Sequence, residues 1–208
     1  GIIRIGGRDI DALSKEERKH FFGVQAAMVF QDPMTSLNPV KRVGAQLTEG
    51  MRYHLKMSAD EANDRAIGLL RQVHIPSPER RMRQYPHELS GGMRQRVVIA
   101  MALACEPRLL IADEPTTALD VTVQKAILDV LDDLRADRNM SLIIITHDLG
   151  VAEGRAERIG VMYAGRLMEL ATADDLFADM RHPYTQALLR SIPSTDMPSH
   201  TRLHPIPG

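Results

Sequence analysis

Two motifs decide the fold of this chain: Leu89-Ser90-Gly91-Gly92-Met93 and Leu109-Leu110-Ile111-Ala112-Asp113-Glu114. In the first, a glycine pair follows the serine and precedes an apolar run over residues 97–102, which predicts a helix whose N-terminal amides are unobstructed and bind anions. In the second, four apolar residues predict a strand buried on both faces, and two carboxylates stand where that strand leaves the sheet. Because open α/β sheets bind ligands at such strand ends, the two motifs together indicate a phosphate-handling site.

The composition limits the classes of protein to which the chain can belong. Its 208 residues suffice for one sizeable core, with or without a small lobe. A formal net charge of -1 argues against a broad basic surface for nucleic acid, although it allows a local basic patch. The single cysteine, Cys105, excludes an internal disulfide, the early residues lack a signal-peptide profile, and we expect a reducing cytosolic setting. The apolar runs are shorter than the ~20 residues that a membrane-spanning helix needs, so we expect membrane association only through a partner.

At its two motifs the sequence resembles the ATPases of ABC transporters. The first motif matches the ABC signature and the second matches Walker B. Three further matches follow the family order: Gln31 resembles the Q-loop glutamine, Ala118-Leu119-Asp120 the D-loop, and His147 the switch histidine. Within the family, the stretch Gln31–Pro39 and the segment His182-Pro183-Tyr184-Thr185 are similar to the oligopeptide, dipeptide and nickel importers.

This resemblance implies a fold, cofactors and partners. The implied fold is an α/β, P-loop NTPase-like ABC ATPase domain with a mainly parallel sheet and a helical lobe, and the implied cofactors are ATP and Mg²⁺. The chain would energise an importer of peptides or similar small solutes. The implied partners are a second copy or paralogous ATPase subunit, permease subunits in the membrane and, indirectly, a solute-binding protein, but no nucleic acid. The expected location is the cytoplasmic face of the plasma membrane, as a peripheral subunit.

The local sequence pattern predicts the elements and their order. Ser14 with Glu17, and Ser58 with Glu61, have the spacing of capping boxes. The prolines of residues 33–39 mark a loop. Strands are expected at 2–5, 26–30, 108–112, 142–146, 158–163 and 166–170, and helices at 14–20, 43–55, 59–73, 121–138, 173–180 and 184–191. We expect four parts: core strands up to the Q-loop (1–32), a helical lobe (33–88), the signature helix with the RecA-like core (89–192) and an open tail (193–208).

Each carboxylate of the Walker B motif has its own expected role. Asp113 is placed to hold Mg²⁺, through water as this reluctantly dehydrated ion prefers, and Glu114 is the candidate general base for the attacking water. Gln31, at another strand end, would ligate Mg²⁺ and move when phosphate leaves. Taken alone, an Asp-Glu pair at a strand end is more simply a helix or turn cap, but the signature upstream favours the catalytic interpretation.

The remaining site residues keep simpler alternatives. By resemblance, Ser90, Gly91 and Gly92 contact the γ-phosphate that is bound on a second copy, in a head-to-tail dimer; the alternative is an ordinary N-cap with turn glycines. His147 would sense the γ-phosphate through a hydrogen bond, whereas a histidine there is otherwise a satisfied loop residue. Asp120 is equally well explained as the N-cap of the next helix.

The P-loop pattern Gly-x-x-x-x-Gly-Lys-Ser/Thr is absent from the sequence, in which no lysine follows a glycine. By resemblance this loop precedes a strand like residues 2–5, so we expect the chain to be a fragment that begins after it and does not hydrolyse ATP by itself. By the same resemblance, an aromatic residue that stacks on adenine is expected upstream. The peptide-importer subgroup often continues into a cysteine-rich segment that can hold an iron-sulfur cluster, and the sequence contains no such segment. The alternatives are a non-hydrolysing regulatory partner that lost its P-loop and an ABC ATPase of DNA repair, although the latter places long coiled coils between the Q-loop and the signature.

Two spatial predictions follow. Asp113, Glu114 and His147 are expected at the same edge of the sheet, because each follows the end of a strand. The helical lobe is expected to dock on the membrane subunits through an exposed apolar groove between the helices at 43–55 and 59–73. The transported solute and the choice between homodimer and heterodimer are not readable from the sequence.

Overall fold

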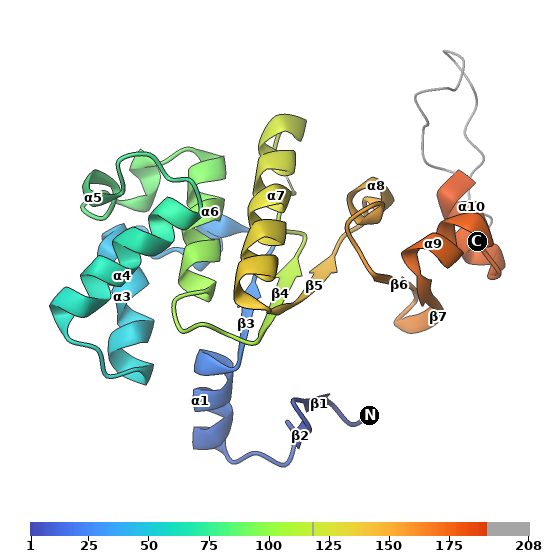
Figure 1. The fold of residues 1–208 in the computed structure, drawn as a ribbon, viewed down its shortest axis with the longest axis horizontal. Helices are drawn as coiled ribbons and strands as arrows, with labels where there is room; N and C mark the ends of the chain where they lie inside the picture. The colour runs from blue at the N-terminus through green and yellow to red at the C-terminus, as the bar shows by residue number, and fades with distance from the viewer. Residues whose placement is uncertain (118, 191–208) are drawn as a thin grey trace. The chain divides into compact units, whose positions relative to one another are not determined.

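The computed structural model describes residues 1–117 and 119–190 (Figure 1). They form two compact units, which divide after Ile145. The strands of the first unit are β1 (Arg4–Ile5), β2 (Arg8–Asp9), β3 (Ala26–Val29), β4 (Leu109–Asp113) and β5 (Ser141–Ile145). Its helices are α1 (Lys15–Val24), α2 (Pro33–Ser36), α3 (Val43–His54), α4 (Ala59–Gln72), α5 (Pro78–Arg81), the 3-10 turn η1 (Pro86–Glu88), α6 (Gly91–Ala102) and α7 (Val121–Arg138).

The centre of the first unit is a parallel sheet in the order β3-β4-β5. Helix α7 connects β4 to β5, which is the crossover that the sequence predicts. In the register of this sheet, Met28, Ile111 and Ile143 share one row, and Val29, Ala112 and Ile144 share the next. Because the side chains of neighbouring rows point to opposite faces of the sheet, the row of Met28 belongs to one face and the row of Val29 to the other.

The two faces of the sheet are covered differently. Val29 and Leu110 are fully buried in the main core, together with apolar residues of α6 and α7. On the other face, Met28, Ile143 and Ile145 keep exposed fractions of 38%, 49% and 47%. The prediction that the strand at 109–112 is buried on both faces is therefore wrong for the second face, where Ile111 is only partly buried, because α6 and α7 pack on the same face.

The helical lobe shares the main core. The predicted capping box at the start of α4 is confirmed: the Ser58 hydroxyl accepts from the Glu61 amide at 3.3 Å, and the Glu61 carboxylate accepts from the Ser58 amide at 2.9 Å. The expected apolar groove between α3 and α4 is not present, because the apolar side chains of the two helices are buried against one another and in the main core. That docking prediction is wrong. The buried residues are Val43, Leu47, Met51, Ala62, Ala66, Leu69 and Leu70.

The N-terminal segment covers the amino end of the second sheet face. Strands β1 and β2 form a short antiparallel pair around a turn at Gly6 and Gly7, as the expected strand, turn and resumed extended segment indicate. Helix α1 begins with the predicted capping box of Ser14 and Glu17. Its Phe21 packs with Ile10 and Ala26 in a small buried cluster. Between β3 and α3, α2 is a single helical turn within the stretch that the prolines indicated as loop.

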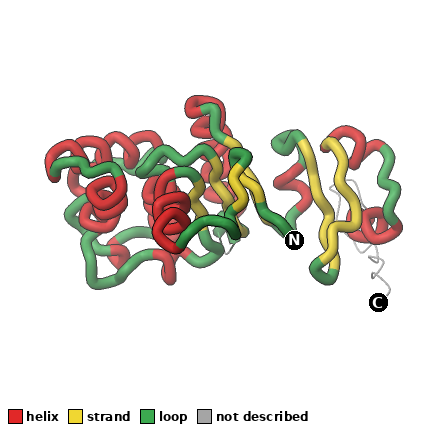
Figure 2. Tube along the Cα trace, turned by 90° about the horizontal axis from the view of Figure 1, so that it is seen from below, coloured by secondary structure: helices red, strands yellow, loops and turns green. Residues whose placement is uncertain are grey.

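The second unit is described on its own, up to residue 190. It contains α8 (Leu149–Ala152), the hairpin strands β6 (Arg158–Tyr163) and β7 (Arg166–Thr172), α9 (Ala173–Ala178) and α10 (Pro183–Arg190). Figure 2 shows its two long strands side by side with the helices packed along them. The predicted hairpin is confirmed, with Ala164 and Gly165 at positive φ in the turn. The predicted tail at 193–208 lies outside the described residues.

One carboxylate anchors the helix that begins in the His182-Pro183-Tyr184-Thr185 segment. Glu169 of β7 accepts hydrogen bonds from the backbone amides of Arg181 at 2.9 Å and His182 at 3.2 Å. The nearby Thr185 side chain, followed by these amides, holds the pKa of Glu169 below its usual value. No helix within residues 1–117 or 119–190 is long and apolar enough to cross a bilayer.

Candidate functional site

The site is built at the carboxyl end of β4. Asp113 is the last residue of the strand, and Glu114 follows with a left-handed backbone at φ 44°. The Glu114 amide still donates to the Ile145 carbonyl at 2.8 Å, so the sheet continues for one bond while the chain turns out of it. A non-glycine residue in this conformation is uncommon, and such strain is concentrated at functional sites.

Gln31 meets Glu114 across the top of the sheet. It lies two residues beyond the end of β3, the parallel neighbour of β4. Its Nε2 donates to Glu114 Oε2 at 2.6 Å. Parallel neighbours end at the same edge, so two predicted site residues that are far apart in the sequence are brought into contact. Their roles in catalysis stay predictions.

A residue that the sequence reasoning missed is Thr117. Its hydroxyl donates to the same Glu114 oxygen, Oε2, at 2.8 Å, and its amide donates to the Glu114 carbonyl at 3.2 Å. The signal was available, since a threonine three residues from a carboxylate has the spacing of a side-chain-supported turn.

The signature lies at an exposed helix start. The Ser90 hydroxyl accepts a hydrogen bond from the Met93 amide at 3.4 Å and caps α6, which confirms the N-cap alternative. The contact with a γ-phosphate stays a prediction. Gly92 is required by packing: a β-carbon there would lie 2.7 Å from Val123 Cγ1 of α7. Ser90 and Gly91 are exposed, which leaves this helix N-terminus open to an anion.

Asp120 caps the next helix. Its Oδ1 accepts from the Val123 amide at 2.9 Å, which confirms the N-cap interpretation for α7. Its D-loop role stays a prediction, and Ala118 of the same motif lies outside the described residues.

His147 is exposed and belongs to the second unit, two residues beyond the end of β5. Within the first unit, β5 ends at Ile145, which is paired with Asp113 in the sheet register. The strand ends therefore agree with the expected common edge. The placement of His147 itself beside Asp113 stays a prediction.

The oxygen ligands at the strand ends suit Mg²⁺ better than a metal ion that is bound entirely by protein side chains. In the described ranges, 1–117 and 119–190, no group of three or more His, Cys, Asp and Glu side chains gathers as a metal site. Mg²⁺ usually binds to one or two protein oxygens and completes its shell with water and phosphate. The Asp113 carboxylate and the Gln31 amide oxygen are donors of this kind, so the residues present fit the ion.

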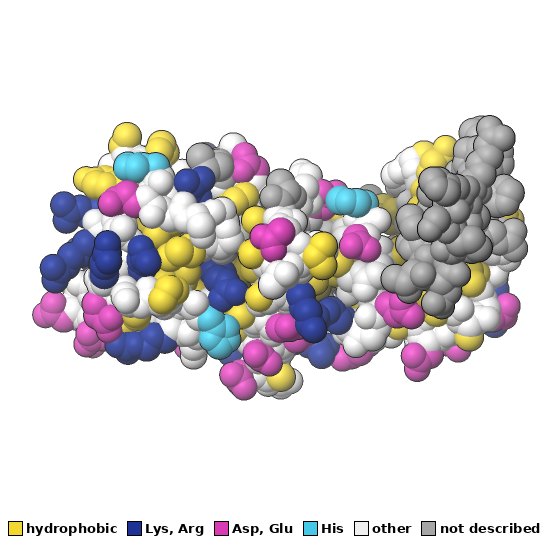
Figure 3. Space-filling view, turned by 90° about the horizontal axis from the view of Figure 1, so that it is seen from above, with side chains coloured by type: hydrophobic (Ala, Val, Ile, Leu, Met, Phe, Trp, Pro, Cys, Tyr) yellow, Lys and Arg dark blue, Asp and Glu magenta, His cyan; other side chains and the backbone are white. Residues whose placement is uncertain are grey.

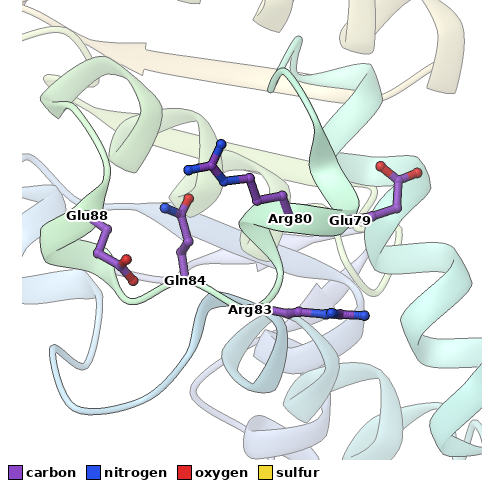
Figure 4. Close-up of a pocket in the computed structure, with 5 residues that line it drawn as sticks. All are labelled: Glu79, Arg80, Arg83, Gln84 and Glu88. Atoms are coloured by element: carbon purple, nitrogen blue, oxygen red, sulfur yellow. The ribbon is translucent and has the colours of Figure 1, made fainter.

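A hollow in the described part of the surface lies away from this site. The hollow in Figure 4 is lined by Glu79, Arg80, Arg83, Gln84 and Glu88 and contains none of the predicted site residues. Glu79 is paired with Arg71 of α4. On the face shown in Figure 3, acidic and basic side chains are intermixed, in accord with the near-zero net charge.

Comparison with protein families fits the geometry of this site. The family model described as "ABC transporter" matches residues 1–117, more than half of the chain. The chain belongs to the ABC transporter family. A second family model, "Oligopeptide/dipeptide transporter, C-terminal region", matches residues 168–208 of this ABC protein.

Curated relatives agree with both matches. The chain is 53% identical over 208 residues to the oligopeptide transport ATP-binding protein OppD of Bacillus subtilis, covering 100% of the chain and 58% of that protein. It is 50% identical over 206 residues to the dipeptide transport ATP-binding protein DppD of Escherichia coli K12, covering 99% of the chain and 63% of that protein. The chain thus spans about 60% of the length of these relatives.

Solved structures confirm the predicted α/β fold of an ABC ATPase. The dimeric post-hydrolysis state of the ATP-binding cassette MJ0796, bound to ADP and Pi, is 28% identical to this ABC protein with a TM-score of 0.72, and covers 81% of this chain and 72% of that one. Another dimeric structure of MJ0796 gives a TM-score of 0.74 at 28% identity, covering 83% of this chain and 73% of that chain.

Proposed function

We propose that this chain carries the signature, Walker B and switch segments of an ATPase subunit that energises an importer of peptides or similar small solutes. The observation that carries the proposal is the hydrogen bond from Gln31 to Glu114, since it joins two strand ends into one site beside Asp113. The match of residues 168–208 to the C-terminal region of oligopeptide and dipeptide transporters supports the class of solute.

In the proposed reaction Glu114 removes a proton from water as the water oxygen attacks the γ-phosphorus of ATP. The bond between that phosphorus and the bridging oxygen breaks, so ADP and inorganic phosphate leave, and Glu114 returns its proton to solvent or product. Gln31 orients the Glu114 carboxylate. Asp113, through water, and the Gln31 oxygen would hold Mg²⁺, which would supply charge neutralisation at the phosphates.

The remaining residues act on the γ-phosphate. The exposed N-terminus of α6, at Ser90, Gly91 and Gly92, donates amides to the γ-phosphate on a second copy, and Asp120 lies near that contact. His147 donates a hydrogen bond to the same group. The proposed assembly is a head-to-tail ATPase dimer on the cytoplasmic face of the plasma membrane, bound to permease subunits that receive solute from a binding protein.

Substitution of the base tests this function. In the complete protein that contains this sequence, Glu114→Gln is expected to lower kcat for ATP hydrolysis by about 10²- to 10⁴-fold, because the proton acceptor is lost, while ATP binding persists. Steady-state phosphate release and equilibrium nucleotide binding measure the two effects. Glu16→Gln, at an exposed position of α1, is the matched control and should hydrolyse ATP normally. Normal turnover by Glu114→Gln would show that another group activates the water.

The missing P-loop pattern gives a second test. Residues 1–208 by themselves are expected to show no measurable ATP turnover, because they contain no loop of that pattern to cradle the β- and γ-phosphates. Phosphate release by the chain alone, compared with the complete protein, is the measurement. Turnover by the chain alone would contradict this proposal. If the complete protein were also inactive yet bound a paralogous ATPase, the regulatory alternative would hold.

A DNA-repair function is not supported by the lobe. Between Gln31 and the signature, its longest helices are α3 with 12 residues and α4 with 14. Both pack in the main core with the sheet, and no coiled coil extends from the described part of this segment. The curated relatives named above are transport proteins.

A further inference from the structure

The loop that follows the candidate base is locally fixed. Thr117 donates its amide to the Glu114 carbonyl at 3.2 Å, and Leu119 donates its amide to the Thr116 carbonyl at 3.2 Å, so two overlapping turns follow the strand. The Thr116 side chain is buried and anchors them. The Thr117 hydroxyl is therefore held at a set position relative to Glu114.

Two donors from different parts of the fold converge on one oxygen. Gln31 Nε2 and Thr117 Oγ1 lie 2.6 Å and 2.8 Å from Glu114 Oε2. Gln31 reaches the carboxylate from the end of β3, whereas Thr117 belongs to the same loop as Glu114. Any motion of the β3 end relative to β4 alters the first contact, but the second moves with the carboxylate.

Thr117 is distinguished by the carboxylate that it contacts. Thr35 donates its hydroxyl to the backbone carbonyl of Asp32 at 2.9 Å, and Thr172 donates its hydroxyl to the Asp175 carboxylate at 2.8 Å at the start of α9. Both are ordinary local uses of a threonine hydroxyl. The Thr117 hydroxyl donates its hydrogen bond to the carboxylate that the proposed function identifies as the base.

We propose that Thr117 is a positioning residue for Glu114, whose hydroxyl aims the carboxylate at the attacking water, including when Gln31 moves away. This inference rests on the proposed function. A carboxylate on a flexible side chain samples several rotamers, and one charge-assisted hydrogen bond from a fixed donor selects among them. Because proton transfer requires close and correct geometry, loss of that bond lowers the rate of the chemical step more than it weakens ATP binding.

The kinetic test uses Thr117→Val, which keeps the shape of the side chain and removes the donor. In the complete protein, kcat is expected to fall about 5- to 20-fold, with KM for ATP changed by less than about twofold. Thr117→Ser retains the hydroxyl and should recover most of kcat. The matched control is Thr122→Val, at an exposed threonine near the same loop, with wild-type kcat expected.

A double-mutant cycle separates positioning from a general effect on the loop. If Thr117 acts through Glu114, Thr117→Val causes no further loss in the Glu114→Gln background. An equal fold-loss in both backgrounds, a KM effect without a kcat effect, or wild-type kcat for Thr117→Val would each overturn the proposal.

A structural readout is independent of turnover. A crystal structure of Thr117→Val should show the Glu114 carboxylate rotated or in two orientations, with the backbone turn of residues 114–117 retained; an unmoved carboxylate would contradict the inference. Normal hydrolysis by Glu114→Gln would refute the proposed role of Glu114 as base, whereas this readout would still decide whether Thr117 orients it.

Discussion

The two faces of the β3-β4-β5 sheet carry similar apolar residues but have different surroundings. Val29 and Leu110 lie in the main core beneath α6 and α7, whereas Met28 and Ile143 keep large exposed fractions on the opposite face. Asp113 is paired with Ile145 in the row that belongs to this second face. The strands are alike, so the difference shows that burial at the carboxyl half of this sheet is set by where helices pack. In the described chain this half is stabilised mainly by the first face.

The largest expected effect comes from deleting a side chain on the covered face. Leu110→Ala should lower the free energy of unfolding by about 3 kcal/mol, because it removes buried methyl groups and leaves a cavity under α6 and α7. Native-state hydrogen exchange of the β4 and β5 amides measures the loss within this unit. A change below about 1 kcal/mol would mean that the core collapses around the deletion and that the faces do not differ.

The matched deletion on the exposed face should cost less. Ile143→Ala removes a side chain that is already half exposed, so the expected loss is about 1 kcal/mol by the same exchange measurement. The side chain leaves no enclosed cavity. A loss equal to that of Leu110→Ala would show that something covers this face in solution, and would break the comparison.

The smallest expected effect concerns helix α1, which packs on the amino end of the second face. The His54 ring of α3 lies against α1, since a β-carbon on Gly23 would lie 2.2 Å from His54 Cε1. Burial lowers the pKa of His54 below its usual 6.5, and so do nearby positive charges. Those charges are His20, Lys19 and Lys56; the Tyr53 ring also contacts His54, and Lys15 and Arg18 line the same hollow.

Acidification is therefore expected to weaken the contact between α1 and α3. The folded pKa of His54 is the lower one, so the unfolded state binds more protons, and stability that is present above pH 6.5 is lost as the pH falls through the folded pKa. Hydrogen exchange of α1 amides between pH 7 and pH 5, corrected for the intrinsic rate, measures the effect. His54→Gln should remove most of this pH dependence, and an unchanged slope would show that His54 does not cause it.

The local elements were predictable because local chemistry determines them. The capping boxes at Ser14 and Ser58, and the turn at Ala164, follow from residues a few positions apart. The prediction of an apolar groove was wrong because sequence periodicity shows which side of a helix is apolar, but not which neighbouring element covers that side. The α2 turn was missed because its prolines also suit a loop.

The site was predictable as a set of residues but not as a set of contacts. Sequence motifs identified Gln31 and Glu114, but not the hydrogen bond between them, which depends on the order of strands in the sheet. The left-handed backbone of Glu114 and the Thr117 hydroxyl bond also escaped prediction. Both depend on how the chain leaves the sheet, and residue spacing alone does not determine this.

Gly92 lets the first turns of α6 and α7 pack closely against one another. A β-carbon at this position would lie 2.7 Å from Val123 Cγ1, so a larger residue would force Val123 to shift. Asp120 ties the start of α7 to the same residue through the Val123 amide. A rotation of α6 about its axis is therefore expected to press on the beginning of α7, which follows directly on the loop that carries Thr117 and Glu114.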